Sequence, residues 1–121
     1  MKILRRTDYI FGMAHLNPQK SGLGSVIIWA DHAGILREVS HRNVPRVKLS
    51  KGDLSVSISI SSHPVLLAGN FKSRKHLKEF SEAIDYVARN HEIFNRHYND
   101  TDFSFDDEAL FDALRAKGEY Q

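Results

Sequence analysis

The sequence predicts an α+β fold, an antiparallel sheet of three to five strands followed by two or three C-terminal helices. The hydrophobic period is two residues up to Gly69 and 3.6 residues from Ser73 onward, so strands are expected first and helices last. Gly, Pro, Asn and Asp punctuate the first part and leave segments of strand length. A chain of 121 residues with 41% hydrophobic residues is long enough for one core but not for two, which makes residues 1–121 a single domain.

The first expected strand follows a loop. Residues 17–24 hold one Pro and two Gly, which is typical of a flexible connection. Ser25 to Ala30 is rich in β-branched residues and predicts a strand. Residues 35–44 fit a short strand and an irregular loop equally well.

The clearest strand is Leu54 to Ile60, in which large apolar residues alternate strictly with serines. Arg46 to Leu49 alternates as well, and the turn-forming residues 50–53 between the two segments predict a hairpin. Val65 to Gly69 predicts a further strand. The simplest arrangement of these segments is an antiparallel meander.

A long helix is expected after the sheet. Ser73 is a typical N-cap residue, and the helix should run to about Asn90. Its buried face is predicted from apolar residues spaced three or four apart. These residues are Leu77, Phe80, Ile84 and Val87.

Two shorter helical segments complete the expected fold. The first runs through Ile93, Phe94 and Tyr98, and the polar residues 99–105 then form a linker. Ser104 is the expected N-cap of the last helix, because acidic residues fill the following turn, and Gly118 should end it. Its apolar side would consist of Leu110, Phe111 and Leu114.

Charge is divided along the chain. Residues 1–78 hold 13 Lys and Arg against 4 Asp and Glu, whereas residues 79–121 hold 4 against 11. Such a division is typical of a protein that meets a charged partner. The acidic helical segment, about residues 99–121, is also a candidate to cover the basic surface of its own chain.

The basic residues predict a contact surface made of a hairpin group and a group at the start of the long helix. If the sheet brings the two groups together, they form a patch that can hold phosphates or an acidic protein. Arg74 and Lys75 lie in the first helical turn, where the helix dipole disfavours cations. A bound anion would explain that placement, and so would a solvated surface. The predicted partner-binding residues are Arg42, Arg46, Lys48, Lys51, Lys72, Arg74, Lys75 and Lys78.

The acidic segment permits a second interpretation. Acidic residues mixed with aromatic ones can dock on a basic partner or imitate a nucleic-acid backbone. A capped helix that folds its apolar side onto the domain is the alternative that the start and stop signals favour. The acidic residues are Asp100, Asp102, Asp106, Asp107, Glu108 and Asp112.

We expect no catalytic residue, no metal site and no cofactor. The chain has no Cys, which excludes thiol nucleophiles and zinc–thiolate sites. Its seven histidines lack the helical spacing of a zinc protease, although His32, His41 and His63 with Asp31 are a conceivable metal set. A small toxin-type ribonuclease that uses His41 with nearby cations is a less favoured alternative.

The sequence predicts a cytoplasmic protein without a membrane partner. The longest apolar run, Val26 to Ala30, is too short to cross a bilayer. Charged residues interrupt the first ten positions, which therefore do not fit a secretion signal. The absence of Cys fits a reducing compartment.

Part of the chain resembles a small bacterial family, from Pro45 to about Asp100. The matching stretches are Pro45-Arg46-Val47-Lys48-Leu49, Lys51-Gly52-Asp53, Leu54 to Ile60, Val65 to Gly69, and His97-Tyr98-Asn99-Asp100. They are similar to the Pro-His-x-His-Val segment, the Gly turn, the two strands and the helix end of the family called domain of unknown function 4160. Arg46 and Lys48 stand where that family has two histidines, so a role of those histidines does not carry over. The resemblance implies a regulatory or interaction protein of the kind encoded in toxin–antitoxin-like or mobile-element loci.

Together these observations predict a non-catalytic interaction protein that recognises a charged partner. The expected role is a bacterial or phage regulatory or defence-related binding module, antitoxin-like or inhibitor-like, with a protein as its partner. Binding of nucleic acid through the basic hairpin and helix start is the alternative. A homodimer is also open, because an uncharged serine face invites pairing if its strand lies at a sheet edge.

Overall fold

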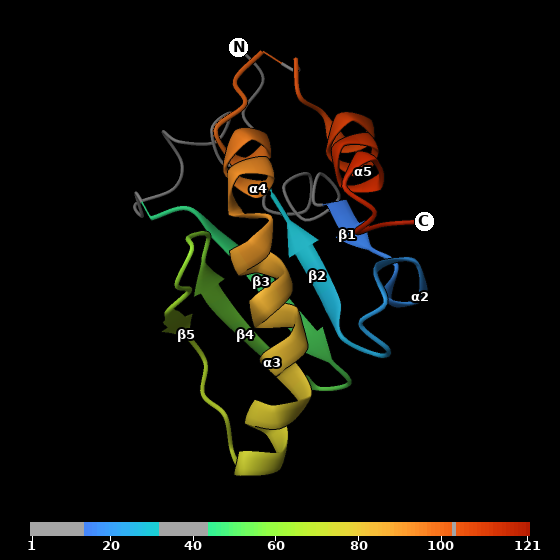
Figure 1. Cartoon of the computed structure of the whole chain (residues 1–121). Coiled ribbons are helices and arrows are strands. Elements are labelled where there is room, and N and C mark those ends of the chain that lie inside the picture. Colours follow the sequence, from blue (N-terminus) through green and yellow to red (C-terminus); the bar gives the residue numbers. More distant parts are fainter. Residues whose placement is uncertain (1–13, 32–43, 103) are drawn as a thin grey trace.

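The computed structural model of the chain describes residues 14–31, 44–102 and 104–121. Its strands form one five-stranded antiparallel meander in the order β1-β2-β3-β4-β5 (Figure 1). The strands are β1 (Ala14–Leu16), β2 (Ile27–Ala30), β3 (Arg46–Lys51), β4 (Leu54–Ser59) and β5 (Leu66–Ala68). The helices are α2 (Pro18–Ser21), α3 (Arg74–Arg89), α4 (His91–Tyr98) and α5 (Asp107–Ala116). The predicted α+β class, with the sheet first and the C-terminal helices last, is confirmed.

The core lies between one face of the sheet and the C-terminal helices. Figure 1 shows α3 crossing in front of β3 and β4, with α4 and α5 beyond its C-terminal end. Alternate strand residues point into this core because side chains along a strand alternate between the two faces. The buried strand residues are Leu16, Ile28, Val47, Leu49, Val56 and Ile58, and the buried helix residues include Phe80, Tyr86, Val87, Phe94, Leu110 and Leu114.

The β3–β4 hairpin is tighter than the sequence suggests. The register pairs Lys51 with Leu54, so only Gly52 and Asp53 form the turn, where four residues were expected. Gly52 has a φ of 57°, the positive value that two-residue hairpin turns favour. The strands can therefore extend to the turn itself.

Residues 17–24 contain a short helix where a flexible loop was predicted. Asn17 caps α2, because its side-chain oxygen accepts hydrogen bonds from the backbone N–H groups of Gln19 and Lys20. Pro18 occupies the first helical turn, and Gly22 ends the helix with a φ of 78°. The Pro and Gly that suggested irregular structure act here as helix start and stop signals.

The predictions for α3 hold at its start and fail for one core residue. The Ser73 hydroxyl accepts a hydrogen bond from the His76 backbone N–H at 3.2 Å, as expected of an N-cap. Leu77, however, is 48% exposed, because the first turns of α3 extend beyond the sheet (Figure 1). Tyr86 is buried instead and contributes one of the largest side chains in the core.

The last helix begins two residues later than its expected cap. Asp106, not Ser104, is the N-cap of α5, and its carboxylate accepts a hydrogen bond from the Ala109 N–H at 2.9 Å. Ser104 is engaged elsewhere, since its hydroxyl donates to Asp100 at 3.2 Å. Gly118, with a φ of 73°, follows the helix as predicted.

The longest of the described helices, α3, has 16 residues and a polar outer side. None of the helices within the described ranges has the length and apolar character needed to cross a membrane.

Substitution of Gly69 tests the close packing of the segment after β5 against β4. It has a φ of +83°, and a Cβ added to it would lie 2.8 Å from the Ser55 carbonyl oxygen. Gly22 has a similar φ of +78° but no atom within 4 Å of such a Cβ. We expect Gly22→Ala to lower the free energy of unfolding by about 1 kcal/mol through backbone strain alone, and Gly69→Ala by at least about 2 kcal/mol, because overpacking adds to the strain. Equal losses in urea denaturation would contradict this account.

Candidate functional site

The face of the sheet that points away from α3 carries a row of side chains across four strands. The register places His15 opposite Trp29, Trp29 opposite Lys48, and Lys48 opposite Ser57. We call this side of the sheet the outer face. Its at least partly exposed strand residues include His15, Ile27, Trp29, Arg46, Lys48, Ser50, Ser55 and Ser57. Ser59, which the register places opposite Arg46, is buried.

Trp29 is held in one orientation at the centre of the outer face. Its indole N–H donates a hydrogen bond of 2.8 Å to the Ser50 hydroxyl on the neighbouring strand, so the ring leans over β3. The His15 ring lies beside it, with 5.2 Å between the ring centroids and a tilt of 41°. The Lys48 ammonium lies 6.0 Å from the indole centroid, within the range of a cation–π contact. An aromatic ring and a cation are thus presented side by side.

The outer face is positively charged. None of the five strands contains Asp or Glu. Arg46 and Lys48 point outward, and neither forms an ion pair within the described residues; the Arg46 Nε reaches only the Val44 carbonyl, at 3.4 Å. The charge on this face is therefore not neutralised by neighbouring strand residues.

The structure divides the predicted basic residues between two sides of the sheet. Arg46 and Lys48 belong to the outer face, whereas Lys51 lies on the helix side, where its Nζ is 3.5 Å from Glu79 of α3. The hairpin and helix-start groups therefore do not merge into one surface. Exposed at or just before the start of α3 are Lys72, Arg74, Lys75 and Lys78. Arg42 lies outside the described residues, as do His32 and His41.

The acidic segment lies at the far end of the molecule from the basic helix start. Figure 1 shows the α4–α5 connection at one end and the start of α3 at the other. Most of its carboxylates serve local structure: Asp106 caps α5, Asp112 pairs with Arg115 at 2.9 Å, and Asp107 contacts His97. Within this fold the segment does not cover the basic helix start.

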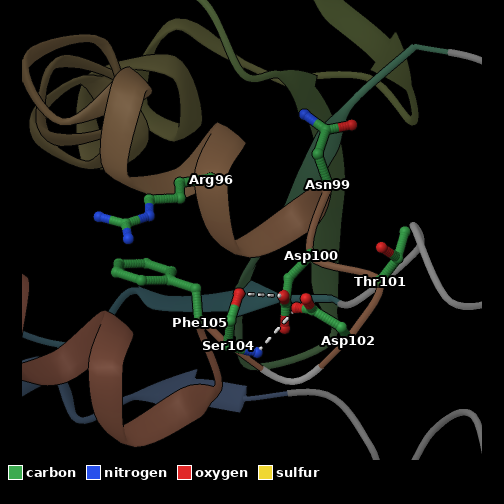
Figure 2. A pocket seen from close by; sticks show the side chains of 7 residues that line it. All are labelled: Arg96, Asn99, Asp100, Thr101, Asp102, Ser104 and Phe105. Carbon is green, nitrogen blue, oxygen red and sulfur yellow. Dashed lines mark hydrogen bonds between the residues drawn. The ribbon is translucent and has the colours of Figure 1, made fainter.

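A cavity of about 310 Å³ lies beside the α4–α5 connection (Figure 2). Its lining residues are Arg96, Asn99, Asp100, Thr101, Asp102, Ser104 and Phe105. The Arg96 guanidinium lies 4.4 Å from the Phe105 ring centroid. The Ser104 backbone N–H donates to Asp102 at 3.1 Å, and hydrogen bonds from Ser104 lower the pKa of that carboxyl. These contacts fix the shape of the connection between the helices.

No group of three or more His, Asp or Glu side chains in the described part of the chain is arranged to hold a metal ion. Among the described residues, His97 on α4 and Asp107 on α5 form a histidine–carboxylate pair, with 2.8 Å between Nε2 and Oδ1. His97 is fully buried, so a substrate cannot reach its ring. The pair joins α4 to α5 and therefore stabilises the packing of the two helices.

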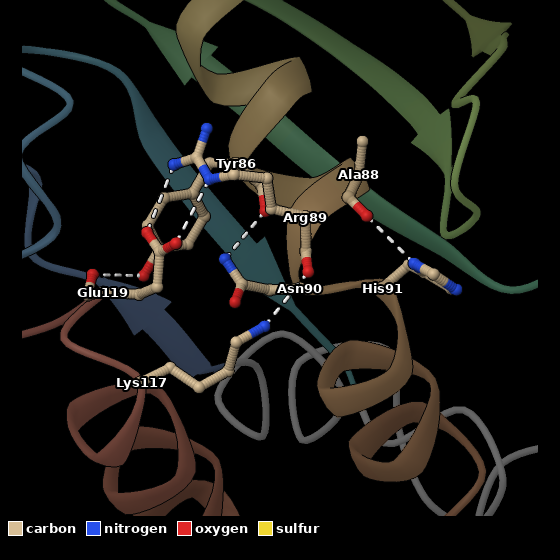
Figure 3. A network of polar contacts seen from close by, with 7 residues as sticks. All are labelled: Tyr86, Ala88, Arg89, Asn90, His91, Lys117 and Glu119. Atoms are coloured by element: carbon tan, nitrogen blue, oxygen red, sulfur yellow. Dashed lines mark hydrogen bonds and ion pairs between the residues drawn. The ribbon is translucent and has the colours of Figure 1, made fainter.

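A polar network ties the C-terminus to α3 (Figure 3). The Tyr86 hydroxyl donates to the Glu119 carbonyl at 2.7 Å, and Arg89 makes two hydrogen bonds of 3.1 Å to the Glu119 carboxylate. The Lys117 ammonium donates to the Arg89 carbonyl at 3.1 Å. Hydrogen bonding to Arg89 lowers the pKa of Glu119, and burial raises the pKa of Tyr86.

The serine face belongs to an inner strand. β4 pairs with β3 on one side and β5 on the other, so its hydroxyls do not line a sheet edge. The edge strand β5 has three residues, and its pairing with β4 shifts in register between Ser57 and Ile58. Short and irregular edges resist pairing with a second sheet. A homodimer remains a prediction that these serines do not support.

Comparison of the chain with protein-family models, curated proteins and solved structures finds no match in any of the three. The resemblance to domain of unknown function 4160 therefore stays a prediction. The function of the protein is therefore inferred from its own residues, foremost those of the outer face.

Sequence reasoning identified Arg46 and Lys48 but not Trp29 or His15. All five residues from Val26 to Ala30 are apolar, which hides the alternation that turns Trp29 outward. Strand alternation could have indicated the outward position of Trp29, because Trp29 shares a face with Ile27 and lies on the face opposite Ile28. Only the register with β3 puts Trp29 beside a cation.

The His97–Asp107 contact predicts a specific loss of stability. Asp107→Ala removes an acceptor from a fully buried ring, which should lower the free energy of unfolding by about 1–3 kcal/mol. Glu108→Ala is the matched control, because it removes a carboxylate from the same helical turn without touching His97. Both variants lose the favourable dipole term of a few tenths of a kcal/mol. Equal losses in urea denaturation would argue against the contact.

The Arg89–Glu119 pair predicts a dependence of stability on pH. The pKa of Glu119 is lower in the folded state than its ordinary value of 4.5. Glu119 therefore contributes stability that is present above pH 4.5 and is lost as the pH falls through the folded-state pKa. Since the Arg89 side chain is 54% exposed, solvent screening should limit the contribution to less than about 1 kcal/mol. The stability difference between the wild type and Glu119→Gln should shrink below about pH 4.5 in urea melts. A difference that stays constant down to pH 3 would contradict the assignment.

Proposed function

We propose that the protein is a non-catalytic binding module that contacts a negatively charged partner through the outer face of its sheet. One observation carries this proposal: Trp29 stands between His15 and Lys48 on a sheet whose strands hold cations but no carboxylates. Cations on a sheet face whose strands carry no carboxylate attract anionic partners and raise their rate of encounter. A fixed aromatic ring among them adds contact area.

Other charged parts of the molecule support the proposal less well. The cations at the start of α3 lie on the helix side of the sheet. Within the described residues, none of them makes a cation–π contact with an aromatic ring. The acidic residues of the α4–α5 region are engaged in caps and ion pairs, and His97 is buried. An antitoxin-like or inhibitor-like role in a regulatory or defence system remains the setting predicted from the sequence, and it is compatible with an anionic partner.

The proposal predicts that Arg46 and Lys48 contribute more to polyanion affinity than cations at the start of α3 do. Arg46→Gln with Lys48→Gln should weaken binding of heparin, used as a base-free polyanion, by about tenfold or more at low salt. The slope of log affinity against log salt should also fall by about 1–2, because each lost phosphate-like contact removes roughly one released counterion. Binding can be measured by titration calorimetry at several salt concentrations.

The matched control is Lys72→Gln with Lys75→Gln. It removes two positive charges at exposed positions on the helix side, so it changes the net charge equally and should change affinity only slightly. Equal losses in the two double variants would show a general charge effect and overturn the outer-face assignment. A wild-type protein that binds no polyanion at low salt would overturn the proposed function itself.

A further inference from the structure

We propose that the anionic partner is a single-stranded nucleic acid, one base of which stacks on Trp29 while Lys48 and Arg46 contact its phosphates. This inference rests on the proposed function and deepens it. Charge complementarity names an anion, but the face carries more than charge. Its central element is an aromatic ring, which distinguishes ligands that have rings from those that do not.

The geometry of Trp29 suits stacking. The hydrogen bond from its N–H to the Ser50 hydroxyl directs the indole toward β3 and restrains the ring. Its neighbours are the His15 ring, with 5.2 Å between the centroids, and the Lys48 ammonium, which lies over the indole ring and would move aside for a stacked base. Sheet faces with aromatic residues bind unpaired bases in this way, because every base offers a flat π-face.

The cations and hydroxyls lie where the rest of a nucleotide would reach. Arg46 and Lys48 are two residues apart on the same face of β3, about 7 Å along the strand. Their flexible side chains can therefore contact successive parts of one backbone. On the other side of the row, the serine hydroxyls of β4 offer donors and acceptors to base edges without adding charge.

A single strand fits this face better than a duplex does. In a duplex the π-faces of the bases are covered by their stacked neighbours, so Trp29 would find no partner. Within residues 14–31, 44–102 and 104–121, the outer face is formed by strands and presents no helix or ribbon that could insert into a groove. An acidic peptide would use Arg46 and Lys48 but would leave Trp29 without a stacking partner.

Because Trp29 is the sole tryptophan of the chain, its fluorescence reports on this face directly. The wild-type protein is titrated at low salt with oligo(U), oligo(dT), a DNA duplex of the same length, and poly-glutamate. We expect strong quenching by the two single strands and little by the duplex or poly-glutamate. The two single-strand arms distinguish RNA from DNA as the source of the base. Binding of a single strand without quenching would overturn the stacking inference.

Two variants of Trp29 complete the test by anisotropy of a labelled single strand. Trp29→Leu should weaken binding by about tenfold or more, since one base–aromatic stack is lost, and Trp29→Phe should retain most of the affinity. Circular dichroism and urea denaturation show whether both variants are folded, and heparin binding by the wild-type protein tests the proposed function separately. If heparin binds but Trp29→Leu holds the single strand as tightly as the wild type does, stacking is wrong while the proposed function stands. If neither heparin nor any nucleic acid binds, both fall.

Discussion

Burial of one face of the sheet beneath α3, α4 and α5 is the constraint on which the rest of the structure depends. Each fully buried Val, Leu or Ile contributes about 1.5–3 kcal/mol, and β3 and β4 together supply four such residues. A slip of one residue in either strand would turn these side chains to the opposite face. The same burial therefore fixes the register, and with it the residues that must point outward.

The C-terminal helices complete the core and separate the charges of the chain. The Tyr86–Glu119 and His97–Asp107 contacts hold the acidic region against the C-terminal part of α3 and against α4, far from the basic start of α3 (Figure 1). Electrostatic attraction between exposed charges weakens beyond about 8–10 Å at physiological salt. The acidic region therefore does not neutralise the cations at the helix start, and its residues act mainly as helix caps and as ties between helices.

In the proposed complex, stacking of a base on Trp29 would replace the cation–π contact with Lys48. An exposed cation–π contact such as that of Lys48 is worth about 0.5–1 kcal/mol, whereas stacking of a base on an aromatic ring is worth about 1–3 kcal/mol. A base can therefore displace the ammonium from the ring, and the lysine regains its loss by contacting a phosphate. His15 and Ser50 limit the motion of the ring, so less conformational entropy is lost on binding.

The sequence by itself determined the α+β class, the β3–β4 hairpin, the Ser73 cap and the outward direction of Arg46 and Lys48, because periods of two and 3.6 and local capping are encoded within a few residues. Tertiary structure decided what local patterns do not contain. Leu77 is exposed because α3 extends beyond the end of the sheet. Ser104 donates its hydroxyl hydrogen bond to Asp100, and Asp106 caps α5. Lys51 and Lys48 lie on opposite faces of the sheet, since Lys51 pairs with Glu79 on the helix side. Strand register placed Trp29 beside Lys48 and His15 across three strands, which a run of five apolar residues conceals. Side-chain neighbours across a sheet depend on pairing between distant segments, and pairing is set by the whole core.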